Sequence, residues 1–306
     1  MESNRLSRFS RALSIAPMQL TERDREIIRL VQRHRFLRSS HIIAFIGGSP
    51  QNLLRRLQLL YHHGLLERPR AQLDYYREGG SRCMVYGLGD KGTSALNRER
   101  DRSVPPLRPS ESNRAVGRIF LEHALLVSDV MVAIELVCRQ DGRVRLLSDD
   151  ELHVKNGPRR PFKWSVTPSS SRLKLGVIPD RVFGLEFPDQ AGAPTRAFFF
   201  LEADRGTMPV SRRNLSQTSF FRKLLAYEST WSQSIHTRRF GFHRFRVLTI
   251  TSSVERLRTL LTACSQLKRG QGLFLFAERT ILDRPAQILS PIWQTVRPGE
   301  RASLLD

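Results

Sequence analysis

The sequence has few cysteines and no long apolar run. Its three cysteines, Cys83, Cys138 and Cys264, are widely spaced and form neither a disulfide framework nor a CxxC metal knuckle. This usage indicates a reducing cytoplasm. No stretch approaches about 18 consecutive apolar residues, so neither a membrane-spanning helix nor a membrane partner is expected. Residues 1–20 carry arginines without a continuous apolar region, so we also expect no secretion signal.

The sequence also lacks the local motifs of several enzyme classes. It has no GxxxxGKS/T loop for nucleotide phosphates, which argues against an ATP-driven motor. It has no local Ser-His-Asp signature either. The adjacent pair His62-His63 lies on a predicted helix, where neighbouring side chains diverge by about 100°, so joint ligation of one metal ion is not expected.

Acidic residues are scarce relative to basic ones. The chain has 29 Asp and Glu residues against 50 Lys and Arg residues, a formal net charge of +21. Such a surface attracts polyanions, and binding to a nucleic acid would release its counterions. Nucleic acid is therefore the expected partner. Charge by itself does not separate DNA from RNA, and the basic and aromatic segment 238–245 keeps an RNA-binding protein as an alternative.

The length of 306 residues and the hydrophobic content of 40% predict two packed domains of mixed α/β class. Apolar periodicity is weak between Arg100 and Arg118, where prolines and serines gather, so this segment is interpreted as an interdomain linker. The predicted ranges are a basic arm at 1–17, a first domain at 18–100, a linker at 101–117, a second domain at 118–283 and a tail at 284–306.

Three helices are predicted in the first domain from their capping residues. Thr21 and Asp24 form a capping-box pattern in front of an apolar period of helical spacing. A serine at position 39 or 40 begins a second, shorter helix, and Ser49 followed by Pro50 begins a third. Two strand-like segments with a glycine-rich tip follow as a hairpin. Three helices and a hairpin in this order predict a winged helix-turn-helix.

A winged helix-turn-helix would bind double-stranded DNA through its third helix and its wing. Asn and Gln side chains can pair with adenine in the major groove, and Arg with guanine, while basic wing residues hold phosphates or the minor groove. The predicted DNA-binding residues are Gln51, Asn52, Arg55 and Arg56 on the helix and Arg68, Arg70, Arg77 and Arg82 on the wing. Two alternatives remain: a winged domain that binds protein, and Arg55-Arg56 as a solvated helix face.

The second domain is predicted to have an α/β core. Its elements follow the order helix, three strands, helix, strand, helix, strand. The predicted helices cover 118–140, 215–231 and 254–267; the predicted strands cover 144–147 with 151–154, 177–187, 196–202, 245–251 and 273–276; a polar insertion covers 156–174.

Two strand-like segments of this domain end in carboxylates. Asp180 follows one apolar run, and Glu202 and Asp204 end the other. Alternate residues of a strand share a face, so Glu202 and Asp204 emerge together, and Asp180 joins them if its strand lies alongside. Buried acids repel one another unless a cation neutralises them, and hard oxygen ligands suit Mg²⁺ or Mn²⁺. The alternative to a metal site is solvated carboxylates or ion pairs with Arg181, Arg205 or Arg222.

The order of elements resembles the restriction-endonuclease-like nucleases of the PD-(D/E)xK superfamily. Pro179-Asp180 matches the first half of their motif, and Glu202 matches the next acid. The resemblance implies a catalytic set of Asp180, Glu202, Asp204 and Lys223, and metal ligands Asp180, Glu202, Asp204 and Glu122 for Mg²⁺ or Mn²⁺. The sequence departs from the motif because Asp204 stands where the superfamily has Lys. Lys223 on the following helix would take that role, with Arg205 as the alternative.

Over residues 18–235 the chain resembles the bacterial replication-relaxation family of plasmid and mobile-element proteins. The resemblance is carried by the winged segment and by EHALLVSDVMVAIEL, IPDRVFGLE, FFFLEADRGT and KLLAY. It implies a role in plasmid replication and relaxation, with duplex DNA and other replication or mobilisation proteins as partners. A tyrosine-type relaxase is not indicated, because no His-x-His metal cluster is recognisable.

Two functions therefore remain open from the sequence. One is a DNA-binding protein whose second domain nicks or cleaves DNA with a divalent metal ion. The other is a non-catalytic DNA-binding regulator whose second domain is a degenerate nuclease. A homodimer is not decided either, because the sequence has no heptad seam.

Overall fold

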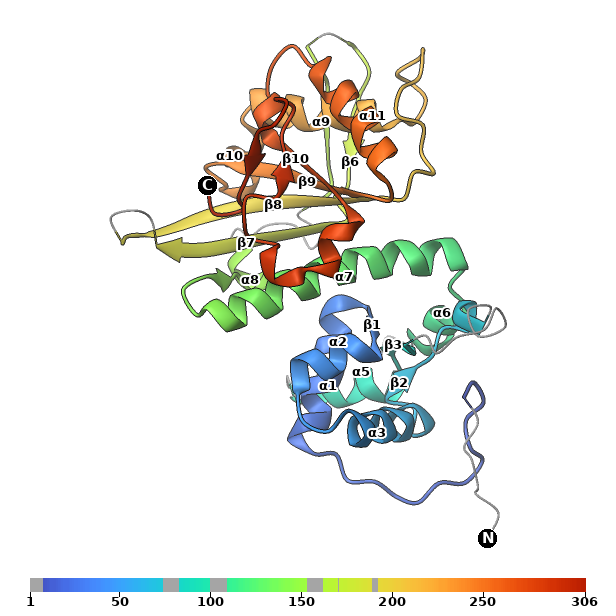
Figure 1. Ribbon diagram of the computed structural model, residues 1–306. Helices are drawn as coiled ribbons and strands as arrows, with labels where there is room; N and C mark the ends of the chain where they lie inside the picture. Colours follow the sequence, from blue (N-terminus) through green and yellow to red (C-terminus); the bar gives the residue numbers. More distant parts are fainter. Residues whose placement is uncertain (1–7, 74–82, 100–108, 153–161, 170, 189–191) are drawn as a thin grey trace. The chain divides into compact units, whose positions relative to one another are not determined.

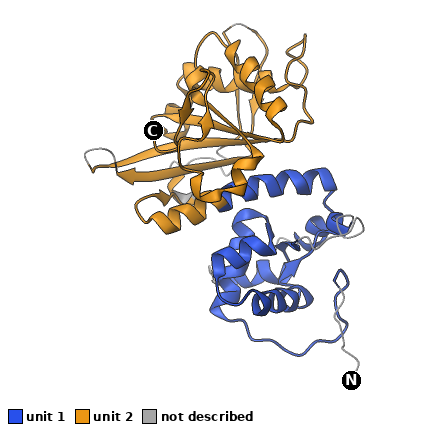
Figure 2. Ribbon diagram, viewed as in Figure 1, with its two compact units in different colours: residues 1–132 blue, residues 133–306 orange. Residues whose placement is uncertain are grey.

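The computed structural model describes residues 8–73, 83–99, 109–152, 162–169, 171–188 and 192–306. The chain divides into two compact units, residues 1–132 and residues 133–306 (Figure 2). Helices and strands are mixed in both, which confirms the predicted mixed α/β class. Among the described residues, no helix has both the length and the apolar character needed to cross a membrane.

Unit 1 begins with the helices α1 (Glu22–His34), α2 (Ser39–Ile46) and α3 (Pro50–His62) (Figure 1). The capping box at the start of α1 is present, because the Thr21 hydroxyl accepts from the backbone of Asp24 and the Asp24 carboxylate accepts from the backbone of Thr21. The side chain of Ser49 caps α3 in the same way. These two predicted helix starts are confirmed.

A small antiparallel sheet completes the first part of unit 1. Its strands β1 (Phe36–Arg38), β2 (Leu66–Glu67) and β3 (Val85–Leu88) lie in the order β1-β3-β2. The short helix η1 (Arg70–Gln72) follows β2. The predicted strands after the third helix are thus both present, and β1 is an addition that the sequence did not indicate.

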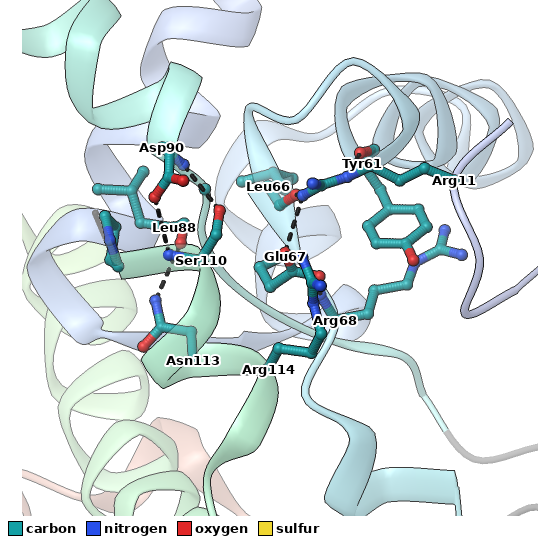
Figure 3. A network of polar contacts seen from close by, with 12 residues as sticks. Arg11, Tyr61, Leu66, Glu67, Arg68, Leu88, Asp90, Ser110, Asn113 and Arg114 are labelled. Atoms are coloured by element: carbon teal, nitrogen blue, oxygen red, sulfur yellow. Dashed lines mark hydrogen bonds and ion pairs between the residues drawn. The ribbon is translucent and has the colours of Figure 1, made fainter. Parts of the chain in front are cut away.

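The segment predicted as a linker contains a helix that belongs to unit 1. Helix α6 (Pro109–Ala115) follows α5 (Asp90–Glu99), and residues 101–108 of the predicted linker lie outside the described residues. Asn113 donates from its side-chain amide to the carbonyl of Leu88 on β3. The backbone N–H of Ser110 donates to the Asp90 carboxylate (Figure 3). Polar contacts rather than an apolar stripe hold α6, which explains why periodicity did not reveal it.

Helix α7 (Arg118–Asp141) matches the predicted long helix and contains the boundary between the units, at Val132 and Ala133. The prediction placed the domain boundary before this helix. The N-terminal part of α7 belongs to unit 1 because it bonds to that unit's core: Arg38 donates to the Asp129 carboxylate in a bidentate pair, and the Ser128 hydroxyl donates to the carbonyl of His34.

Unit 2 is built on a mixed sheet with the strand order β12-β11-β10-β9-β8-β7-β4 (Figure 1). Strand β8 pairs antiparallel with β7 and parallel with β9, and β9 pairs parallel with β10. The strands are β4 (Arg145–Leu146), β7 (Arg181–Pro188), β8 (Pro194–Asp204), β9 (Phe245–Thr251), β10 (Phe274–Glu278), β11 (Trp293–Gln294) and β12 (Arg301–Ala302). The helices that follow β8 and β9 are α9 (Phe220–Ser232), α10 (Ile235–Phe240) and α11 (Val254–Ser265).

Several predictions for unit 2 are wrong in detail. Residues 149–152 form the short helix α8 (Asp149–Leu152), where part of a strand was predicted at 151–154. The predicted polar insertion at 156–174 contains strand β5 (Trp164–Val166), which pairs with β6 (Leu175–Val177). The tail at 284–306 is part of the unit, since β11 and β12 extend its sheet. Unit 2 also contains the short helices η2 (Gln271–Leu273), η3 (Arg279–Asp283) and η4 (Pro285–Gln287).

An aromatic core under α9 and α11 fixes the face on which the acids of β8 lie. Phe198 and Phe200 point into it, where Phe198 stacks on Phe242 and Phe200 stacks on Tyr227 of α9. Because side chains alternate along a strand, Glu202 and Asp204 continue this row toward the end of β8. The apolar residues of the core and the two carboxylates therefore lie in one row on the same face of β8.

Candidate functional site

Two buried acids form the end of the apolar row on β8. Glu202 is 2% exposed and Asp204 is 7% exposed. Desolvation of two carboxylates is costly unless hydrogen bonds or cations compensate it. Each carboxylate has its own partners: those of Glu202 lie on α9, and those of Asp204 lie on β9 and α11.

Glu202 is bound by two side chains of α9. Its Oε2 lies 2.5 Å from Nζ of Lys223, and its Oε1 accepts a hydrogen bond from the Tyr227 hydroxyl at 2.6 Å. Lys223 and Tyr227 are one helical turn apart, so both reach the same carboxylate. The hydroxyl of Ser219 caps α9 and fixes where this helix begins. The structure therefore brings together two of the predicted catalytic residues, Glu202 and Lys223.

Burial dominates the electrostatics of this group. It raises the pKa of the Glu202 carboxyl, and the Lys223 ammonium opposes that rise. Burial by itself would lower the pKa of Lys223, but the charges of Glu202 and Asp180 outweigh it and raise that pKa. Burial, together with the Glu202 charge, also raises the pKa of Tyr227 well above its ordinary value. Lys223 is accordingly held as a cation, and Tyr227 as a neutral hydrogen-bond donor.

Asp180 lies beside Glu202. Its Oδ2 accepts a hydrogen bond from the backbone N–H of Ala203 at 2.8 Å, and its own N–H donates to the carbonyl of Leu201 at 3.0 Å. These bonds fasten Asp180 at the start of β7 against the end of β8, on either side of Glu202. The predicted neighbourhood of Asp180 and Glu202 is therefore present, and the Asp180 charge contributes to the raised pKa values of Glu202 and Lys223.

Asp204 is held by a different helix. The guanidinium of Arg256 donates from Nε to Oδ2 at 2.8 Å and from Nη2 to Oδ1 at 2.9 Å, and the Thr251 hydroxyl donates to Oδ2 at 2.8 Å. A bidentate pair of this kind neutralises the carboxylate and engages both of its oxygens. The sequence alternative of an ion pair is thus correct for Asp204, and its partner Arg256 was not among the arginines that the sequence suggested.

Arg256 was missed from the sequence. It lies in the first turn of α11, 52 residues after Asp204, and Ser253 caps that helix. Its Nη2 also donates to the carbonyl of Met208. The helix dipole does not favour a basic residue in the first turn. Nothing in the neighbouring sequence indicates that such a residue pairs with a buried carboxylate. Its role depends on β8 and β9 being neighbours in the sheet.

The predicted metal ligands do not gather as one cluster of acids. Within the described ranges, no group of three or more His, Cys, Asp or Glu residues is placed to hold a metal ion. Asp204 is engaged by Arg256. Glu122 belongs to unit 1, where it pairs with Arg118 on the same helix at 2.9 Å. The candidate ligands in unit 2 are therefore reduced to Asp180 and Glu202.

A buried hydroxyl beside Glu202 bears on whether this pair could hold a metal ion. Thr249 is fully buried on β9, directly across from Glu202, and its Oγ1 has no hydrogen-bond partner among the residues described. A bound water or ion can be the partner of a buried hydroxyl that has no hydrogen bond within the protein. Mg²⁺ needs only one or two carboxylates, with water and substrate phosphates as its other ligands. Of the predicted ligands, Asp180 and Glu202 are the two that would be left to hold Mg²⁺ or Mn²⁺, and the Glu202 oxygens already accept from Lys223 and Tyr227.

The predicted DNA-contacting residues of α3 fall into two groups. Gln51, Asn52 and Arg55 are exposed on one face of the helix, and no hydrogen bond within the described chain engages their side chains. Arg56 instead turns toward α1, where its Nε donates to Oδ1 of Asp24 at 2.7 Å. Asp24 is only 1% exposed. Arg56 thus serves the packing of α3 against α1, a role that the sequence did not predict.

The predicted wing residues are also divided. Arg68 is buried and stacks over the ring of Tyr61 (Figure 3). It also donates to the hydroxyl of Tyr86 at 3.1 Å. This guanidinium is turned inward and is not placed for a phosphate, which corrects its predicted role. Arg70 is exposed at the start of η1. Arg77 and Arg82 lie outside the described residues.

Part of the predicted basic arm packs on unit 1 around a buried acid. Glu67 on β2 is 1% exposed and accepts from Arg11 at 2.8 Å and from Arg114 of α6 at 3.0 Å (Figure 3). Arg11 also donates to the carbonyl of Tyr61. Glu67 therefore joins three segments that are far apart in the sequence. Residues 1–7 of the arm lie outside the described residues.

Comparison with known proteins agrees with the sequence resemblance. The sequence model of the replication-relaxation family matches residues 28–244, which is more than two thirds of the chain. The matched range contains α3 together with Asp180, Glu202 and Lys223, and it ends before β9. No curated protein and no solved structure matches the chain.

Proposed function

Because the chain belongs to the replication-relaxation family, we propose that it binds double-stranded DNA and acts in the replication or relaxation of a plasmid or other mobile element. The observation that carries the proposal is the exposed polar face of α3, formed by Gln51, Asn52 and Arg55. This helix is the third of three and precedes the β2–β3 pair, the order found in winged helix-turn-helix domains. In that fold the third helix enters the major groove.

Amide and guanidinium side chains on this face suit the edges of bases. Gln and Asn can form two hydrogen bonds with adenine, and Arg can form two with guanine. The net charge of +21 supplies the sequence-independent part of the affinity by releasing counterions from the phosphates. The exposed Arg70 in η1 would contact the backbone rather than the bases. The face of α3 would then give specificity, and the remaining basic surface would give affinity.

DNA binding can be tested by fluorescence anisotropy with labelled duplexes drawn from a random pool. The intact protein should bind duplex DNA at moderate salt, with an affinity that falls steeply as salt rises. The double variant Gln51→Ala/Arg55→Ala should lose sequence preference, whereas Arg258→Ala, an exposed arginine of α11, should keep it. Failure of the intact protein to bind any duplex, or a preference for structured RNA over DNA, would overturn the proposal.

A second candidate function, metal-dependent nicking or cleavage of DNA, is favoured by the placement of Asp180, Glu202 and Lys223. Asp180 and Glu202 would hold Mg²⁺ or Mn²⁺, an ion that generates a hydroxide-like nucleophile and offsets charge on the scissile phosphate. Lys223 already bonds to Glu202 and would supply a proton or a positive charge at Nζ beside the reacting phosphate. Tyr227 would orient Glu202 from behind, because its hydroxyl donates to the opposite oxygen.

Cleavage can be tested with supercoiled plasmid in the presence of Mg²⁺ or Mn²⁺. The intact protein should convert the plasmid to the nicked form, and the double variant Asp180→Asn/Glu202→Gln should not. The matched control is Glu255→Gln, which removes an exposed acid of α11 outside the site. Unchanged plasmid under conditions of demonstrated DNA binding would favour the remaining alternative, a regulator that binds DNA without cutting it.

A further inference from the structure

A cavity of about 490 Å³ lies in the part of unit 2 that follows the family match. It is formed by β9, the segment around η2 and the C-terminal strands, and its lining includes Arg246, Arg297 and Arg301. None of Asp180, Glu202, Asp204 and Lys223 lines it. Its volume lies within the range of about 300–1,000 Å³ that is usual for small-molecule sites. The cavity is therefore a separate feature of the fold, and the proposed function does not use it.

The carboxylates at the cavity are already engaged. Glu300 accepts from the Thr295 hydroxyl at 2.5 Å and from the Arg297 guanidinium at 3.4 Å. Asp306 accepts from the backbone N–H of Ser303 at 2.7 Å. Three arginine side chains and two acidic side chains line the cavity. Glu300 pairs with Arg297, and Asp306 bonds to the chain end beside the cavity.

Arg246 is half-buried and is held by a single backbone contact. Its guanidinium donates to the carbonyl of Ser303 at 3.3 Å, a long contact, and no carboxylate of the described chain forms a salt bridge with it. Burial lowers its pKa, the Asp306 charge opposes this, and Arg244 adds to it. A half-buried guanidinium with unused N–H groups is a strong donor for an anion that can accept several hydrogen bonds. Arg301 donates to the carbonyl of Ile292 at 3.2 Å, and it likewise forms no salt bridge with a carboxylate of the described chain.

The rest of the lining consists of apolar side chains, glycine backbone and the polar side chains of Gln271 and Thr295. Leu275 and Val296 provide an apolar wall, and the space above Gly272 is open. Arginines together with apolar side chains suit a ligand with one phosphate and one flat, weakly polar ring. A phosphate monoester offers more terminal oxygens and more charge than a phosphodiester. The volume also admits a single nucleotide rather than a length of duplex.

We propose that the cavity lined by Arg246, Arg297 and Arg301 binds a nucleotide through its phosphate monoester. The phosphate lies against Arg246 and Arg301, and the base lies against Leu275 and Val296. The same chemistry is offered by a free nucleoside monophosphate and by the terminal nucleotide of a 5′-phosphorylated DNA strand.

The test is binding by the intact chain of three probes: deoxyadenosine monophosphate, a short 5′-phosphorylated single strand, and the same strand ending in a 5′-hydroxyl. Calorimetry gives the affinity for the free nucleotide and anisotropy gives it for the strands. The variants are Arg246→Met and Arg301→Met, which remove the guanidinium and keep an apolar stem. Arg258→Met changes the charge equally at an exposed position of α11 and serves as the matched control.

The affinity for phosphorylated probes should fall by at least about tenfold in Arg246→Met and in Arg301→Met, a loss of about 1.4 kcal/mol or more, and should be unchanged in Arg258→Met. Strong binding of the free nucleotide identifies a nucleotide as the ligand. Binding of the phosphorylated strand without binding of the free nucleotide identifies a DNA end as the ligand. Both results support the proposal. Equal affinity for the 5′-hydroxyl and 5′-phosphorylated strands, or equal losses in all three variants, would overturn it. Thermal unfolding of each variant separates lost binding from lost folding.

Discussion

Nζ of Lys223 lies 2.5 Å from Oε2 of Glu202, and this contact places a cation from α9 against a carboxylate of β8 that is 2% exposed. The contact serves two purposes. It compensates part of the desolvation of Glu202, and it places an ammonium group beside the acids that we propose as ligands of a divalent ion. The stability of the unit and the proposed chemistry therefore depend on the same pair of residues.

Replacing Lys223 with Met should lower the free energy of unfolding by about 2–3 kcal/mol, because Glu202 would remain buried without its cation. The loss stays below that of a fully buried pair because the Lys223 side chain is 35% exposed and solvent screens the interaction. Urea unfolding measures it. The double variant Glu202→Gln/Lys223→Met leaves no unpaired charge and should be more stable than Lys223→Met; the reverse order would contradict a buried, ionised Glu202.

Arg256→Met should be the more damaging change at the neighbouring acid. It would leave Asp204 buried without its bidentate partner, at a cost of about 3–5 kcal/mol in the free energy of unfolding. Arg256→Lys keeps the charge but cannot donate two parallel hydrogen bonds, so an intermediate loss is expected. Denaturant titrations of both variants provide the measurement. Equal stability of wild type and Arg256→Met would show that the pair contributes nothing.

Arg55 and Arg56 are adjacent on α3 and should behave differently. Arg55→Ala should weaken DNA binding by about 1–3 kcal/mol and leave unfolding unchanged, because its side chain is exposed. Arg56→Ala should lower the free energy of unfolding by about 2 kcal/mol, since Asp24 loses the guanidinium that bonds to it. Anisotropy and thermal unfolding on the same two proteins make the comparison. Exchanged behaviour of the two variants would contradict the assignment.

The Asp24–Arg56 pair should also make unit 1 sensitive to acid. Burial would raise the pKa of Asp24, but hydrogen bonds from Arg56 and Thr21 outweigh it and lower the pKa below its ordinary value of 3.8. A carboxyl whose pKa is lower in the folded state stabilises the fold above the ordinary pKa, and this contribution is lost as pH falls through the folded pKa. Urea midpoints should therefore fall between about pH 5 and pH 3, and should fall less steeply in Asp24→Asn. Identical slopes would remove Asp24 as the cause.

The accuracy of the sequence predictions follows the range of the interactions concerned. The caps Thr21 and Ser49 act within one turn, so their helices could be predicted from neighbouring residues. The acid row of β8 could be predicted because side-chain alternation along a strand is a local rule. The helix α6 could not, because Asn113 holds it through the carbonyl of Leu88, 25 residues away.

The roles of single basic residues were the hardest to predict. Arg68 and Arg56 look like surface residues in a basic sequence, yet each contacts a buried group of a distant segment. Arg256 had no recognisable pattern at all, and its ion pair with Asp204 spans 52 residues. A charged side chain carries the same sequence signal whether it meets solvent or a buried carboxylate.

The sequence by itself determined the mixed α/β class, the strong positive charge, the starts of the main helices and the carboxylates at the end of a buried strand. Only the tertiary structure decided which cation each carboxylate receives, which arginines remain exposed, and that residues far apart form an arginine-lined cavity. The physical reason is that periodicity and capping act over a few residues, whereas the desolvation of a charge depends on whatever the fold places beside it.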